Sequence, residues 1–192
     1  MAADIGWTAL AWPGLEHVIV SHDADGFRAR GQLVLAEEGL CSVSYQLTCD
    51  SGWRFRTLTI SVTSANADKS LSLVADTDGH WRADGQRRPD LEDCVDIDIN
   101  CTPLTNTLPI RRLDWSRCGS GRLDVAYVSV PELEVHSVWQ RYTRLNAGAA
   151  GQPAFRYESN SFQADLSVDD GGFVVDYPGL WRRVTAGQVA PA

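Results

Sequence analysis

The sequence predicts an all-β protein built on an antiparallel sheet, and three observations lead to this fold class. First, alternation of apolar and polar residues dominates the chain and is cleanest between Cys41 and Cys49. Second, turn signals such as Asp-Gly, Glu-Gly and Gly-Gly separate the alternating segments at hairpin-like spacing. Third, no long segment carries a helical period. About ten strands at this spacing are typical of antiparallel all-β folds.

Each alternating segment places apolar residues on one face, for a core, and polar residues on the other, for water. In the N-terminal half such segments occur at residues 27–35, 41–49 and 57–62. In the C-terminal half they occur at residues 123–130, 133–145, 155–168 and 173–177. We expect the Gly- and Ala-rich segment 146–153 to form a mobile loop. The tail at 185–192 carries nothing that would anchor it.

The stretch at 91–113 contains more special residues than any other part of the chain. It begins as a strand, with Ile97 and Ile99 on one face and Asp96 and Asp98 on the other. The simplest interpretation of the two aspartates is the polar face of a strand in contact with water. An alternative is that they hold a nearby arginine by charge-assisted hydrogen bonds.

A short helix is expected over residues 102–108, where the alternation stops. Thr102 can accept a hydrogen bond from a free N–H group, and Pro103 is tolerated at the first helical position. Pro109 is expected to end this helix after about a turn and a half. Three small polar side chains interrupt its apolar sequence: Thr105, Asn106 and Thr107.

Arg111 and Arg112 follow directly and are adjacent in sequence. On a strand the two side chains would point to opposite sides, so that one faces water and the other faces the concave side of the sheet. A buried guanidinium needs an acidic partner or an anionic ligand. We expect the inward arginine either to pair with Asp96 or Asp98 or to contact a ligand.

The motifs of metal and catalytic sites are absent from the sequence. The pattern Asp96-x-Asp98-x-Asn100 resembles the opening of a calcium loop, but Cys101 and Thr107 stand where that loop needs Gly and Glu. The four histidines lack metal-ligand spacing, and no Gly-x-Ser-x-Gly elbow or phosphate-binding loop occurs. The sequence therefore predicts no metal, no cofactor and no catalytic residue.

Length and charge limit the classes of function. A chain of 192 residues is expected to form a single domain over residues 1–192, with an ordered core at about 7–184. The net charge of −8 would repel a phosphate backbone, which argues against a nucleic-acid partner. No segment approaches the roughly 20 apolar residues of an integral membrane helix.

The five cysteines, Cys41, Cys49, Cys94, Cys101 and Cys118, are odd in number and contain no Cys-x-x-Cys pair. This pattern argues against a disulfide framework or a zinc site and favours free thiols. The N-terminal residues carry no basic region followed by an apolar run, as a signal peptide would. We therefore expect a cytoplasmic location.

The central motif resembles the signature of a bacterial family of unknown function named "Putative glycolipid-binding". The resemblance rests on Asp-x-Asp at 96–98 and on Thr-Pro-x-Thr-Asn-Thr-Leu-Pro-Ile-Arg-Arg-Leu at 102–113. It extends to Tyr45, Asp50 and Trp53 and to the segments 78–81, 140–143 and 177–180. It implies the fold of the bacterial lipoprotein and glycolipid carriers, a strongly curved antiparallel sheet that forms a half-open barrel with a short helix at its mouth.

We therefore expect a non-enzymatic protein that holds an amphipathic small molecule, a glycolipid or acyl compound, in a half-barrel cavity. The rival hypothesis is an enzyme of unknown reaction that uses Asp96, Asp98, Asn106 and Arg111. A third is a structural or partner-binding β module.

Trp139 and Tyr142 lie on opposite faces of one predicted strand, so only one of them faces the cavity. The candidate ligand-binding residues are Asp96, Asp98, Thr105, Asn106, Thr107, Arg111, Arg112, Trp139 and Tyr142.

Overall fold

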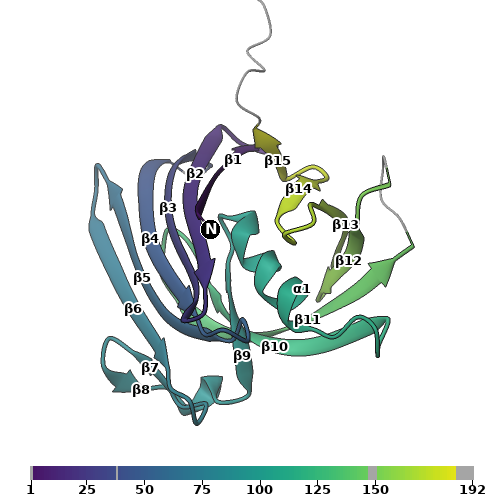
Figure 1. Ribbon diagram of the computed structural model, residues 1–192. Helices are drawn as coiled ribbons and strands as arrows, with labels where there is room; N and C mark the ends of the chain where they lie inside the picture. The colour runs from purple at the N-terminus through teal and green to yellow at the C-terminus, as the bar shows by residue number, and fades with distance from the viewer. Residues whose placement is uncertain (1, 38, 147–150, 185–192) are drawn as a thin grey trace, which may run out of the picture.

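The structure, a computed structural model, describes residues 2–37, 39–146 and 151–184. It is one 15-stranded sheet in the order β8-β7-β6-β5-β4-β3-β2-β1-β15-β14-β13-β12-β11-β10-β9. The sheet curves strongly around the only α-helix of the described residues and does not close into a barrel (Figure 1). The all-β, half-open fold is therefore confirmed. The predicted C-terminal tail, 185–192, and residues 147–150 of the predicted mobile loop lie outside the described residues.

The N-terminal strands are long and form successive hairpins. They are β1 (Ala2–Ala9), β2 (Gly14–Asp23), β3 (Gly26–Ala36), β4 (Leu40–Cys49), β5 (Phe55–Ser64), β6 (Asp68–Ala75), β7 (Trp81–Ala83) and β8 (Gln86–Arg87). The 3-10 helix η1 (Pro89–Leu91) then leads into the second half. The remaining strands are β9 (Cys94–Ile99), β10 (Ser120–Val128), β11 (Val135–Leu145), β12 (Ala154–Ser159), β13 (Phe162–Val168), β14 (Val174–Tyr177) and β15 (Trp181–Val184).

Two details of the predicted strands are wrong. The segment predicted as one strand at 155–168 is a hairpin of β12 and β13 that turns at Asn160, which has a φ of 50°. Asparagine is one of the few residues other than glycine that adopt this conformation readily, so the turn carries no Gly or Pro signal. The sheet also has more than about ten strands, because strands as short as β8 show too little alternation to be recognised.

One strand pair is parallel, and this explains the position of the helix. β9 pairs in parallel with β10, whereas every other pair within the sheet is antiparallel. Parallel neighbours need a crossover connection, usually with a helix in it. Here residues 100–119 make the crossover, and they contain the 3-10 helix η2 (Pro103–Asn106) and the α-helix α1 (Thr107–Arg112). The motif-rich stretch is thus the segment that crosses the concave face (Figure 1).

The helix begins where the sequence predicted but does not end there. The side-chain oxygen of Thr102 accepts a hydrogen bond from the Leu104 N–H at 3.1 Å, as expected of an N-cap. Pro109 does not end the helix, which continues to Arg112. The backbone changes from 3-10 to α geometry at Thr107, so Pro109 lies in the first α-helical turn, where a missing N–H is tolerated.

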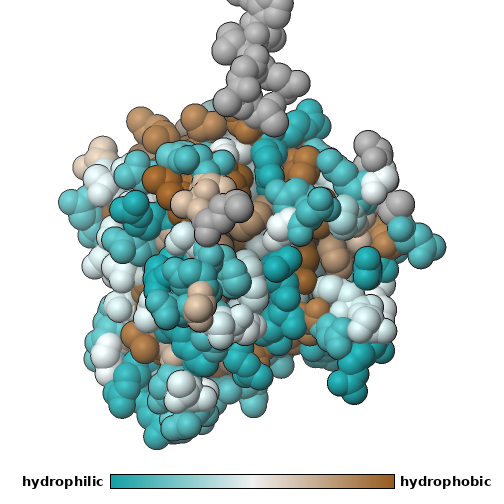
Figure 2. Space-filling model, in the orientation of Figure 1, coloured by the Kyte–Doolittle hydropathy of each residue, from teal (hydrophilic) through white to brown (hydrophobic). Residues whose placement is uncertain are grey.

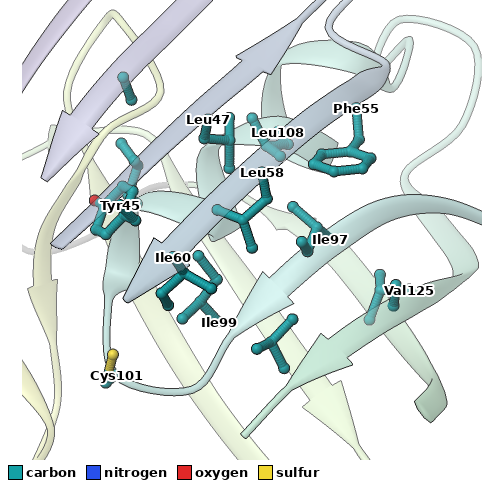
Figure 3. Packing of buried hydrophobic residues seen from close by; sticks show 14 of the residues in the cluster. Tyr45, Leu47, Phe55, Leu58, Ile60, Ile97, Ile99, Cys101, Leu108 and Val125 are labelled. Atoms are coloured by element: carbon teal, nitrogen blue, oxygen red, sulfur yellow. The ribbon is translucent and has the colours of Figure 1, made fainter. Parts of the chain in front are cut away.

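The hydrophobic core fills the space between the curved sheet and the helix. Every residue from 101 to 110 is buried. Figure 3 shows Leu47 and Leu58 on the sheet close to Leu108 of α1, with Ile97 of β9 beside them. The predicted alternation of β4 is confirmed, because its inward residues are buried: Val43, Tyr45, Leu47 and Cys49.

Side-chain hydrogen bonds connect the two ends of the sheet. The Trp81 indole N–H on β7 donates to the Cys94 carbonyl on β9 at 3.1 Å. Arg88, just after β8, donates to the Val135 carbonyl on β11 at 2.7 Å.

Figure 2 shows that hydrophilic residues cover most of the face of the molecule seen in that view and that hydrophobic residues gather along its upper edge. In the described part of the chain, no helix has the length and apolar character needed to cross a membrane.

Candidate functional site

Asp96 of β9 is buried against the helix and Asp98 is partly buried, so the expectation that both aspartates face water is wrong for Asp96. Asp96 is 0 % exposed, and Asp98 is partly covered. Alternation identifies two faces of a strand, but here the polar face is covered by the crossover rather than by solvent. The two carboxylates have different partners: Asp96 pairs with an arginine, and Asp98 accepts hydrogen bonds from uncharged side chains.

Asp96 forms a buried ion pair with Arg112. Arg112 Nη2 lies 2.7 Å from Asp96 Oδ2, and Arg112 Nε donates to Asp96 Oδ1 at 3.2 Å. The arginine side chain is only 16 % exposed. Burial raises the pKa of Asp96, while the hydrogen bonds and charge of Arg112 oppose the rise. The expected pairing of one arginine with an aspartate of β9 is confirmed, and this pair anchors the helix to the sheet.

Arg111 has a different environment. Both arginines lie on α1 rather than on a strand, so the argument from strand phase is wrong, although one arginine does point inward. Arg111 is exposed, with its guanidinium 5.2 Å from the centre of the Trp53 ring. Its stem packs on Gly172, where an added Cβ would lie 2.9 Å from Arg111 Cδ. Arg111 is therefore not assembled with Asp98 and Asn106 into one pocket.

Asp98 is the centre of a polar network that joins β9, the helical crossover and β11. It accepts hydrogen bonds from Thr105 Oγ1 at 2.8 Å and from Gln140 Nε2 at 2.7 Å. The Tyr142 hydroxyl donates to Asn106 Oδ1 at 2.9 Å and lies 3.3 Å from Gln140 Oε1. Burial raises the pKa of Asp98, opposed by the hydrogen bonds from Thr105 and Gln140. The structure thus brings four of the predicted residues together and adds Gln140.

A cavity of about 470 Å³ opens beside this network. Asp98 and Asn106 line its polar side. Its aromatic side includes Tyr157, whose ring centre lies 6.3 Å from that of Tyr177 and 6.0 Å from that of Phe162. We call this cavity the aromatic pocket. It is lined by Asp98, Ile99, Asn100, Thr102, Asn106, Tyr127, His136, Val138, Tyr157, Ser159, Asn160, Ser161, Phe162, Tyr177, Leu180 and Trp181.

Several predicted site residues lie outside the aromatic pocket. Trp139 is on the outer face of β11, with the Arg122 guanidinium 5.2 Å from its ring centre, whereas Tyr142 faces inward. Thr107 is fully buried, and its hydroxyl has no hydrogen-bond partner among the described residues. Thr105 and Tyr142 contact the pocket residues Asp98 and Asn106 from behind.

Sequence reasoning missed Glu16, a carboxylate on β2 that is 0 % exposed. Its carboxylate accepts from the Tyr45 hydroxyl at 2.6 Å and from Thr102 Oγ1 at 2.7 Å. Burial raises the pKa of Glu16 to about 8, against the lowering effect of these hydrogen bonds. The alternation along the strand could have identified Glu16 as buried, because it shares its strand face with the apolar residues Val18 and Val20.

One group of potential metal ligands occurs in the described residues, in the turn between β6 and β7. Ligand atoms of Asp76, Asp78 and His80 lie within 4.8 Å of one another, and all three residues are exposed. Asp76 Oδ1 accepts the backbone N–H groups of Asp78 and His80, each at 2.9 Å. The turn by itself accounts for this arrangement.

Comparisons with known proteins agree with the resemblance seen in the central motif. Residues 4–183 match the family described as "Putative glycolipid-binding". A crystal structure of a DUF1089 family protein from Pseudomonas aeruginosa is similar, with 35 % sequence identity and a TM-score of 0.75. The match covers 88 % of this chain and 92 % of that chain. No curated protein matches.

Proposed function

The chain belongs to the family named "Putative glycolipid-binding", and on that premise we propose that it binds the sugar headgroup of an amphipathic molecule in the aromatic pocket, without catalysis. The observation that carries this proposal is the composition of the pocket wall. The aromatic rings of Tyr157, Phe162 and Tyr177 line the same cavity as the polar side chains of Asp98 and Asn106. The C–H faces of a sugar ring pack well on aromatic rings, while its hydroxyls need fixed donors and acceptors.

Asp98 is suited to accept hydrogen bonds from a sugar. A carboxylate offers about four lone-pair positions, and Thr105 and Gln140 each use one. The remaining positions are available to hydroxyl groups, and hydrogen bonds to a charged acceptor are stronger than neutral ones. Because Thr105 and Gln140 hold the carboxylate, a ligand would meet a group that is already oriented.

Charge further restricts the headgroup to an uncharged sugar. The residues that line the aromatic pocket include one carboxylate and, in the described chain, no lysine or arginine. A phosphate or sulfate group would be repelled by Asp98 and would find no lysine or arginine among these residues to replace its water. The expected location in the cytoplasm remains a proposal, and the free cysteines support it.

Ligand-observed NMR with methyl glycosides of glucose, galactose and mannose tests this function. At least one should bind, and methyl glucoside 6-phosphate should bind more weakly than methyl glucoside. Phe162→Ala should weaken binding roughly three- to tenfold, since Phe162 is 42 % exposed and its loss leaves the core intact. Leu15→Ala is the matched control, because Leu15 is exposed and lies outside the pocket. Equal affinity of wild type and Phe162→Ala would contradict the proposal.

Catalysis at the same pocket is the second candidate, favoured by the raised pKa of the Asp98 carboxyl. A carboxyl group with a raised pKa can serve as a general acid. Glycosidases, however, generally work with two carboxylates on either side of the bond. Asp98 is the single carboxylate among the described lining residues, so binding is the better-supported function. Release of sugar from a glycoside by wild type but not by Asp98→Asn would reverse this order.

A further inference from the structure

A second cavity, of about 530 Å³, lies at the ends of the β3–β4 and β5–β6 hairpins, next to the loop that follows β10. Its wall contains a group of apolar side chains next to polar ones such as Ser64 and Asn66, and the apolar group includes Leu35, Leu40, Val62, Val130 and Pro131. The charged residues of its wall are exposed, which places them at its rim: Glu37, Lys69 and Glu132. We call this cavity the apolar cavity, and its volume is within the range of small-molecule sites.

Leu40 is the feature of this cavity that packing does not explain. Its side chain is 71 % exposed, more than any other large hydrophobic residue of the described chain. Single exposed leucines are common on protein surfaces. An exposed leucine at the mouth of an apolar cavity is more informative, because grouped apolar surface marks a site for an apolar partner.

The apolar cavity adjoins the aromatic pocket. Asn100 lines both cavities. Its side chain is fixed between them, since Asn100 Nδ2 donates to the Val130 carbonyl at 3.3 Å and the Val130 N–H donates to Asn100 Oδ1 at 3.0 Å. Tyr127, which lines the aromatic pocket, also interacts electrostatically with Glu37 at the rim of the apolar cavity. Burial chiefly raises the pKa of Tyr127, and the charge of Glu37 adds to the rise.

We propose that the apolar cavity binds the acyl chain of the molecule whose sugar headgroup occupies the aromatic pocket, with the ligand passing over Asn100. This inference rests on the proposed function, and it defines the ligand as a neutral glycolipid whose chain begins next to the sugar. The aromatic pocket offers the polar groups of Asp98 and Asn106, and the neighbouring cavity offers the apolar side chains of Leu35, Leu40 and Val62, so the two together match the two ends of such a molecule. A free sugar would use only the first, and a hydrocarbon only the second.

Isothermal titration with methyl glucoside and octyl glucoside, below the micelle concentration of the latter, tests the inference. Burial of the longer chain should increase affinity by about tenfold for every two methylene groups that enter the cavity. Leu40→Glu places a charge at the mouth of the cavity and should remove this gain without changing the affinity for methyl glucoside. The matched control is Val34→Glu, at a residue that is 53 % exposed on β3 and outside both cavities.

The outcomes separate the two proposals. A chain-length gain that persists in Leu40→Glu would overturn the acyl site. Failure of both glucosides to bind wild type would count against the headgroup site. The fluorescence of the apolar dye Nile red then tests the apolar cavity alone. Fluorescence enhancement by wild type that is lost in Leu40→Glu supports the acyl site, and unchanged enhancement overturns it. Size-exclusion chromatography tests whether a second protein chain, rather than an acyl chain, fills the cavity. A wild-type dimer that dissociates in Leu40→Glu would mean that a second copy of the chain fills the cavity, and would overturn the inference.

Discussion

Replacing Glu16 by glutamine should change how the stability of the protein depends on pH. Glu16 is fully buried, its oxygens accept hydrogen bonds from Tyr45 and Thr102, and it forms no ion pair with the described residues. Its pKa is about 8 in the folded protein, against 4.5 for an ordinary glutamate. The native state therefore keeps a proton between about pH 4.5 and 8 that the unfolded chain loses.

The sign and the size of the effect follow from this difference. The contribution of protonated Glu16 to the free energy of unfolding is fully present below about pH 4.5. It is lost as the pH rises toward 8, and above pH 8 the free energy of unfolding no longer changes through this group. The two pKa values differ by 3.5, and one pH unit corresponds to about 1.36 kcal/mol, so the wild type should lose at most about 5 kcal/mol across this window. Glutamine cannot ionise, and it has the shape of the protonated acid.

Urea unfolding at a series of pH values from about 5 to 9 measures the effect. The free energy of unfolding of Glu16→Gln should fall less with pH than that of wild type, and the variant should be the more stable protein at the alkaline end. Asp96 and Asp98 titrate in both proteins, so their contributions cancel in the difference. Glu134→Gln, at an exposed position, is the control and should follow wild type. Parallel curves for wild type and Glu16→Gln would refute the reasoning.

Three further predictions concern the fold. Arg112→Ala leaves a buried carboxylate unpaired and should lower the free energy of unfolding by about 3–5 kcal/mol, whereas Arg111→Ala should have little effect, as thermal melting can show. Gly31→Ala should cost about 1–3 kcal/mol in denaturant unfolding, because its Cβ would overlap the Tyr45 ring. Thiol titration without reductant should find all five cysteines free in denaturant, with Cys118, the exposed one, reacting first in the native protein.

These predictions have clear controls and contrary results. Equal melting of the two arginine variants would mean that the ion pair contributes nothing to stability. Gly119→Ala is the control for Gly31, because an added Cβ at Gly119 meets nothing within 4 Å and its backbone needs no glycine. If both glycine variants unfold alike, the fit of the tyrosine against β3 is not tight. Fewer than five thiols in denaturant would indicate disulfides.

Local patterns predicted the strands well because they depend on neighbours in the chain. The alternation between Cys41 and Cys49 identified the buried face of β4, and Thr102 identified the start of the helix. The same alternation was insufficient for Asp98. A strand pattern states which residues share a face, but only the path of the crossover decides whether water or a helix covers that face. The partner Gln140 lies 42 residues further along the chain, beyond the reach of any local pattern.

The site itself was predicted only in part, and the reason is physical. The unusual residues of the crossover are needed because this segment must turn, cap a helix and bury polar groups within a few residues. Thr105 and Tyr142 accordingly hold Asp98 and Asn106 in place. They form the back of the aromatic pocket rather than its surface.

Four of the aromatic residues that line the aromatic pocket come from separate strands of the C-terminal half. Tyr157, Phe162, Tyr177 and Trp181 lie on β12, β13, β14 and β15, and they meet only because the sheet curves. In sequence each is an ordinary aromatic residue in an alternating segment, with the same signal as a core residue. A dense motif therefore marks where the backbone and its buried hydrogen bonds are most constrained. The position of a cavity depends instead on where the curved sheet leaves side chains unpacked, and that is a property of the tertiary structure.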